Sequence, residues 1–220
     1  MAQLPLELGH RASYDGDDFL VASCNQAAVA WLDRWPAWPG PGLAVHGPPG
    51  CGKTHLAHVF LARADARLLR LADLEEPGPP ALLQRSRAWV LDDMPPLPEQ
   101  ALLHFYNGLA EAGGHLLIVS RLPPARWDLR LPDLGSRLAA LPAVRIEPPD
   151  DDLMEALLVK HFADRQIAVA PGVVAYLRTR LERSFASVAR IVDALDRESL
   201  ARRRAVSLVL AREVIERETP

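Results

Sequence analysis

The eight residues at positions 47–54 read Gly47-Pro48-Pro49-Gly50-Cys51-Gly52-Lys53-Thr54, and they match the spacing G-x-x-x-x-G-K-[ST] at every defined position. Glycines in such a loop let successive backbone N–H groups point inward toward a bound phosphate. Lys53 can reach the outer phosphates of a nucleotide, and the Thr54 hydroxyl can hold Mg²⁺. All eight residues, with His55 directly after them, are therefore predicted to bind a nucleotide.

The residues on either side of this loop have the order that a phosphate site needs. Residues 43–46 form a short apolar run typical of a strand, and residues 55–62 continue as a helix. The N-terminus of that helix would face the bound phosphates. A glycine- and proline-rich turn with a chance lysine would not need this order, so we favour a phosphate loop.

A second motif lies at residues 88–93, which read Ala88-Trp89-Val90-Leu91-Asp92-Asp93. An apolar strand that ends in two carboxylates is the form of a Walker B element. Asp92 is predicted to bind Mg²⁺, and Asp93 could orient or deprotonate a water molecule. An Asp pair at a strand end is also common in turns, but the upstream loop favours a catalytic site.

Strands and helices alternate through residues 18–149. Strands are expected at 43–46, 67–71, 88–93, 115–120 and 143–146, and helices at 25–34, 55–62, 82–87 and 97–112. Such alternation predicts an α/β fold with a parallel five-stranded sheet covered by helices on both faces.

The chain changes to helices alone after Pro148 and Pro149. The acidic run 150–152 is expected to cap a helix that ends near residue 165, and further helices are expected at 171–182, at 185–203 and from Ser207 onward. Residues 150–220 are therefore predicted to form a small all-α domain of four helices.

The first 17 residues are predicted to form an extended arm. Gln3, Leu4, Leu6 and Leu8 could dock together, the amide in a polar notch and the leucines in an apolar pocket. A leader whose leucines fold onto the core explains the same residues equally well, so the arm alone does not decide between the two.

The composition is that of a folded protein with a sizeable core. The 220 residues are 49% hydrophobic and carry a formal net charge of -3, which disfavours bulk attraction to nucleic acid. No apolar stretch approaches the length of a membrane span and no signal peptide is recognisable, so we expect a cytoplasmic protein without membrane contact. Cys24 and Cys51 lack metal-ligand spacing, which argues against a zinc site.

Taken together, these motifs resemble AAA+ nucleotide-binding proteins and, more narrowly, the DnaA-related family of bacterial replication proteins. The resemblance covers nearly the whole chain and rests on residues 18–21, 25–26, 47–54, 90–93, 105–107, 119–120, 123–124, 131–138 and 146–149. The length and the Gln3-Leu4 arm are most similar to Hda, the regulatory inactivator of DnaA. The resemblance implies an AAA+ domain, a helical lid and bound ADP or ATP with Mg²⁺.

The resemblance also implies a reaction in a partner's nucleotide site. Arg137, in Gly135-Ser136-Arg137-Leu138, is similar to the arginine finger that AAA+ proteins project into a neighbouring subunit. The implied function is negative regulation of replication initiation, in which Arg137 promotes hydrolysis of DnaA-bound ATP. The arm resembles a motif that binds the sliding clamp of DNA polymerase, with Glu7 where a proline is usual, so DNA would be contacted indirectly through the clamp. Self-association is also compatible with the family.

Two positions depart from the family pattern. Arg121 stands where an aspartate acceptor is expected, and Ala186 stands where the lid arginine is expected. Arg183 or Arg190, on the same helical face, could replace that arginine. Because an arginine cannot act as a hydrogen-bond acceptor, we expect weak intrinsic ATPase activity. The bound nucleotide would then serve to hold this protein in a defined shape.

Two other functions are compatible with the same residues. One is a self-contained ATPase of the helicase-loader or remodelling type, which would depend on Asp93. The other is a non-catalytic DnaA adaptor, which would need the arm but not Arg137. DnaA continues beyond its lid into a helix-turn-helix domain, whereas this sequence ends at Pro220, so origin recognition is not expected.

Overall fold

The computed structural model describes residues 21–93 and 98–218. The arm predicted at residues 1–17, with Gln3, Leu4, Leu6, Glu7 and Leu8, lies outside the described residues. The described part forms two compact units, one of residues 21–48 and 53–147 and the other of residues 49–52 and 148–218.

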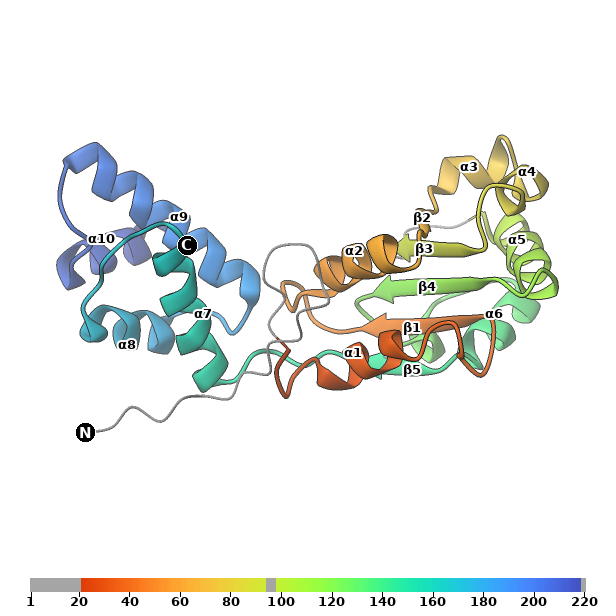
Figure 1. Ribbon diagram of the computed structural model, residues 1–220, viewed down its shortest axis with the longest axis horizontal. Helices are drawn as coiled ribbons and strands as arrows, with labels where there is room; N and C mark the ends of the chain where they lie inside the picture. The colour runs from red at the N-terminus through yellow and green to blue at the C-terminus, as the bar shows by residue number, and fades with distance from the viewer. Residues whose placement is uncertain (1–20, 94–97, 219–220) are drawn as a thin grey trace. The chain divides into compact units, whose positions relative to one another are not determined.

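The first unit is built on a five-stranded parallel sheet in the order β2-β3-β4-β1-β5 (Figure 1). The strands are β1 (Gly42–His46), β2 (Arg67–Leu68), β3 (Ala88–Asp92), β4 (His115–Ser120) and β5 (Ala143–Arg145). This confirms the predicted α/β fold and the number of strands.

Two predicted elements have an end that differs by more than two residues from the structure. Strand β2 ends at Leu68 rather than residue 71, because Leu71 already begins helix α3 (Leu71–Glu75). The helix predicted at residues 82–87 is α4 (Pro79–Leu83), which begins three residues earlier. Proline fits the first turn of a helix, where its missing N–H is not needed, so the two prolines of α4 start the helix rather than a turn.

Helices cover both faces of the sheet. Helix α2 (Lys53–Arg63) packs against β3 and β4 on one face, and α1 (Gln26–Asp33) lies beside β5. The other face is covered by α3, α4, α5 (Glu99–Glu111) and α6 (Pro132–Ala139). The core on this second face consists of buried residues from these helices, from β3 and β4 and from the segments between them: Leu69, Leu74, Leu82, Trp89, Leu91, Leu102, Phe105, Tyr106, Leu109, Leu116, Ile118, Leu134, Leu138 and Leu141.

The second unit contains four helices, as predicted from residue 150 onward. They are α7 (Asp151–Asp164), α8 (Pro171–Arg180), α9 (Phe185–Arg202) and α10 (Leu208–Glu218). Side chains cap three of them: Asp150 accepts a hydrogen bond from the Leu153 N–H (2.8 Å), Ser184 from Ser187 (3.0 Å) and Ser207 from Leu210 (3.3 Å). These caps satisfy backbone donors that a helix leaves open at its first turn.

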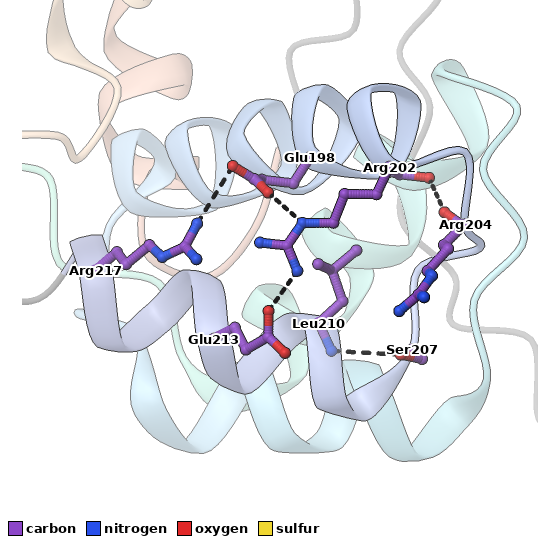
Figure 2. A network of polar contacts seen from close by, with 8 residues as sticks. Glu198, Arg202, Arg204, Ser207, Leu210, Glu213 and Arg217 are labelled. Carbon is purple, nitrogen blue, oxygen red and sulfur yellow. Dashed lines mark hydrogen bonds and ion pairs between the residues drawn. The ribbon is translucent and has the colours of Figure 1, made fainter.

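Ion pairs join the two last helices on their exposed side (Figure 2). The guanidinium of Arg202 lies 2.8 Å from Glu198 on the same helix and also donates to Glu213 on α10. Arg217 approaches Glu198 from α10 at 3.4 Å. The hydrogen bond from Arg202 lowers the pKa of Glu213. Because exposed ion pairs contribute little to stability, the buried apolar residues of α9 and α10 contribute most to the packing of these two helices.

Aromatic rings surround His115, the first residue of β4. The His115 ring meets Trp38 edge-to-face at 5.5 Å and Trp35 at 6.4 Å, and Phe60 of α2 stacks on Trp38 at 5.3 Å. Burial lowers the pKa of His115. The half-buried imidazole therefore packs against the core at this end of the sheet.

This environment predicts a pH-dependent stability. Since the pKa of His115 is lower in the folded chain than in the unfolded chain, the unfolded state binds more protons between the two values. Stability should be highest above pH ~6.5 and should fall as the pH decreases toward the folded pKa. His115→Phe should reduce this dependence without removing it, because the pKa values of His46 and His161 are lowered as well.

Urea unfolding about one pH unit above and below 6.5 measures the effect. The matched control is His104→Gln, which changes an exposed histidine on α5. If His115→Phe unfolds with the same pH dependence as the unaltered chain, the proposed origin of that dependence is wrong.

Candidate nucleotide-binding site

The parallel strands bring four side chains to one edge of the sheet. These are the last residues of their strands: His46 of β1, Asp92 of β3, Ser120 of β4 and Arg145 of β5. The register pairs His46 with both Ser120 and Arg145, and it pairs Asp92 with Val119. Since the predicted phosphate loop follows His46, the sheet places the residues predicted for phosphate and Mg²⁺ at one edge.

The predicted phosphate loop connects β1 to α2. Gly50 and Gly52 have φ angles of 70° and 92°, which glycine adopts without strain. The Gly47 N–H donates a hydrogen bond to the Ser120 carbonyl (3.3 Å), so the loop begins against the end of β4. Thr54 and His55 follow in the first turn of α2, and both are exposed.

Lys53 is the first residue of α2, and its ammonium group points back to the loop. Its Nζ donates a hydrogen bond to the Pro48 carbonyl oxygen at 2.8 Å. A bound phosphate oxygen would compete with this carbonyl as a charged and therefore stronger acceptor. The lysine is thus held beside the loop in a conformation from which a short movement could bring it to a phosphate.

The tip of the loop, residues 49–52, belongs to the second unit. Within that unit, the Phe185 N–H donates to the Gly50 carbonyl at 2.8 Å. A Cβ atom on Gly50 would lie 2.9 Å from the Cβ of Ser184 and 3.1 Å from that of Ala186. Even the short side chains at the start of α9 therefore leave no room for a residue larger than glycine at position 50.

The two carboxylates after β3 differ in their surroundings. Asp92 ends the strand and is half-buried, whereas Asp93 is exposed. Asp93 has a φ angle of 70°, and its N–H donates to the Val119 carbonyl (2.9 Å). A left-handed backbone at a residue other than glycine is strained, and such residues are frequent at functional sites.

His46 is not among the predicted site residues, yet three charged residues lie near it. Burial is the main cause of its lowered pKa, with further contributions from Arg145 and Lys53 and an opposing one from Glu147. The imidazole is therefore mostly neutral at pH 7 and leaves the positive charge to Lys53. The only signal in the sequence was its position directly before the first glycine of the loop.

The residues at and near the positions that depart from the family pattern have the following surroundings. Arg121 is exposed and follows Ser120, whose hydroxyl donates to the Leu122 carbonyl (2.6 Å). In the second unit, Arg183 forms an ion pair with Asp151 (2.8 Å) and Arg190 lies 3.9 Å from Glu218. Both candidates for the lid arginine thus face a carboxylate of their own unit.

Arg137 lies in the last turn of α6 and is exposed. The helix is anchored on either side of it by Leu134 and Leu138, which are fully buried. No residue in the described ranges 21–93 and 98–218 forms a hydrogen bond or ion pair with its guanidinium group. The side chain is therefore available to a ligand outside this chain.

Of the helices in residues 21–93 and 98–218, none is long and apolar enough to cross a membrane. The histidines, cysteines and acidic residues of these ranges do not gather in threes where a metal ion could be held. Mg²⁺ at a nucleotide usually has one or two protein ligands besides phosphates and water, so Thr54 and Asp92 are enough for the predicted site.

Comparisons with known proteins support the fold. A family model described as the lid domain of Hda matches residues 150–215. Domain III of Thermotoga maritima DnaA has a TM-score of 0.77 at 16% identity, over 90% of this chain and 93% of that chain. AMPPCP-bound DnaA from Aquifex aeolicus has a TM-score of 0.69 at 16% identity, over 84% and 68%.

A variant of Thermotoga maritima RuvB shares the architecture as well, with a TM-score of 0.65 at 13% identity, over 88% of this chain and 67% of that chain. Identities this low show a shared fold only. The family model adds that residues 150–215 are similar to the lid domain of Hda. The chain therefore has the fold of DnaA domain III, with a helical lid that resembles the lid domain of Hda.

Proposed function

We propose that the chain is a DnaA-like regulator of replication initiation that promotes hydrolysis of DnaA-bound ATP. It binds ADP or ATP with Mg²⁺ in its own loop, docks on the DNA-loaded sliding clamp and presents Arg137 to the nucleotide of DnaA. The observation that carries the proposal is an exposed arginine without a bonded partner in the described ranges, on a helix anchored in the core.

The proposed nucleotide site consists of residues 47–54 with His55. The pairing of Asp92 with Val119 puts its side chain on the face of β4 that also carries His115, because alternate residues share a face. The rings beside His115 include Phe60 of α2, so Asp92 lies on the α2 side of the sheet. Thr54 lies in the first turn of the same helix, which supports Thr54 and Asp92 as joint Mg²⁺ ligands.

The chain's own hydrolysis is proposed to be weak. Arg121 offers donors only, so it cannot accept a proton or a hydrogen bond from an attacking water. Ala186 has no charge, and Arg183 and Arg190, the candidates to replace it, face Asp151 and Glu218. The bound nucleotide would then hold the loop and lid in a defined shape.

The chemistry in the partner is electrostatic. Charge develops on the γ-phosphate oxygens during hydrolysis, and a planar guanidinium can donate two parallel hydrogen bonds to them. Arg137 can do this without first breaking an ion pair with a described residue of this chain. The proposed clamp contact rests on Gln3, Leu4, Leu6 and Leu8 of the arm.

One observation favours the self-contained ATPase as a second candidate. The left-handed backbone of Asp93 is the kind of strain found at catalytic carboxylates. In that function Asp93 would orient the water in the chain's own site, and Arg137 would not be needed.

Nucleotide binding is tested with Lys53→Ala. Removing a charged donor to the phosphates should weaken ADP binding by about 10- to 100-fold, and isothermal titration calorimetry measures the change. Lys160→Ala is the matched control, because Lys160 pairs with Asp164 on α7. Equal ADP affinities of the Lys53→Ala variant and the unaltered chain would exclude the loop as the nucleotide site.

The reaction in trans is tested with Arg137→Ala. Single-turnover hydrolysis of DnaA-bound ATP on clamp-loaded DNA should slow by about 10³-fold or more. Arg137→Lys should recover little of the rate, because an ammonium lacks the planar pair of donors. Arg126→Ala, which changes an exposed arginine in the turn Pro124–Arg126, should behave like the unaltered chain.

Other outcomes distinguish the alternatives. Suppose that the Arg137→Ala variant stimulates hydrolysis of DnaA-bound ATP fully, and that removal of residues 1–17 abolishes this stimulation. This pair of results would support the adaptor function. Rapid turnover by the isolated chain that depends on Asp93 would support the self-contained ATPase.

A further inference from the structure

Helix α5 holds the start of helix α6, which carries Arg137. Glu99, in the first turn of α5, uses both carboxylate oxygens: one accepts a hydrogen bond from the Arg130 N–H (3.0 Å) and the other from the Leu131 N–H (2.6 Å). Pro132, the first residue of α6, has no N–H to offer. A charged acceptor that binds two consecutive backbone donors makes strong hydrogen bonds, so the carboxylate fixes the backbone directly before α6.

A second contact lies further along the same two helices. Tyr106 follows Glu99 by seven residues, which is nearly two turns and returns to the same face of α5. It is 5% exposed and belongs to the same core as Leu134 and Leu138 of α6. Helices α5 and α6 contact each other. Burial raises the pKa of Tyr106, and the positive charge of Arg137 opposes this rise.

The two contacts define the direction of α6. The start of α5 binds the start of α6, and the third turn of α5 meets the last turn of α6, so the helices run side by side in the same direction. The contacts are about 10 Å apart along each helix, at 1.5 Å per residue. Support at two points this far apart prevents α6 from tilting on the core.

We propose that Glu99 and Tyr106 are positioning residues for Arg137: Glu99 fixes the start of α6, and Tyr106 supports the last turn of α6, which carries the arginine. The inference rests on the proposed finger function of Arg137. An arginine that acts on a partner's phosphate must reach it in one geometry, and a displacement of about 1 Å can slow a reaction by about 100-fold. Neither residue touches the nucleotide.

The first test uses Glu99→Gln and Tyr106→Phe in single-turnover hydrolysis of DnaA-bound ATP on clamp-loaded DNA. The amide can accept only one of the two backbone hydrogen bonds, and phenylalanine removes only the hydroxyl. The maximal rate should fall by about 10- to 100-fold, while the concentration of this chain that gives half the maximal rate should not change. Glu111→Gln, at the exposed end of α5, is the matched control and should leave both values unchanged.

The same two substitutions in an Arg137→Ala background separate positioning from folding. Residues that act only through Arg137 should cause no further loss of rate once Arg137 is absent. A loss of the same size in that background, or a changed half-maximal concentration, would show a general structural effect and would overturn the inference.

Two measurements do not depend on hydrolysis. In the isolated full-length chain, Glu99→Gln should speed amide hydrogen exchange in residues 130–139 by about 10-fold and leave the other helices unchanged. With ¹³C-labelled tyrosine, of which the chain has three, Arg137→Ala should shift the Tyr106 signal and Arg126→Ala should not.

The outcomes of these measurements distinguish a failure of the positioning role from a failure of the proposed function. If Arg137→Ala leaves hydrolysis unchanged, the proposed function is wrong, and the exchange and tyrosine data still decide whether α5 supports α6. If exchange in residues 130–139 is unaltered and both variants keep the full rate, the positioning role is overturned.

Discussion

Parallel pairing of β4 with both β1 and β3 is the constraint on which the rest of the structure depends. The strands are apolar and almost completely buried in their centres, from Leu43 to Val45 and from Leu116 to Val119. Parallel strands end at the same edge, so each connection after a strand begins there. The start of the predicted phosphate loop, the Asp92-Asp93 pair and Arg121 lie at the ends of three neighbouring strands, so this pairing brings them to the same edge.

Charge at this edge fits an anion. Lys53, Arg121 and Arg145 are cations, His46 is mostly neutral at pH 7 because its pKa is lowered, and Asp92 offers a carboxylate for a divalent ion. Arg137 has different surroundings. It is exposed on the short helix α6, which the buried residues Leu134 and Leu138 anchor in the core. The chain thus carries both a loop suited to hold a nucleotide and an arginine suited to act on another nucleotide, which is how we account for the departures at Arg121 and Ala186.

The parts of the fold with a local signal could be predicted from the sequence. The loop, the buried run of β4 and the Asp150 cap each depend on neighbouring residues. The end of β2 could not be predicted, because the residues Arg67-Leu68-Leu69-Arg70-Leu71 are compatible with either a strand or a helix. The place of β2 as the outermost strand of the sheet determines where it ends. The support of α6 could not be predicted either, since Glu99 and Arg130 are 31 residues apart and only the packing of two helices brings them together.

The central claim is that this chain acts on a nucleotide held by its partner. The most direct measurement loads ATP with a radioactive γ-phosphate either on DnaA or on this chain, and follows release of the label in a single turnover on clamp-loaded DNA. The account predicts rapid release from DnaA and slow release from this chain. Rapid release from this chain, with none from DnaA, would contradict it.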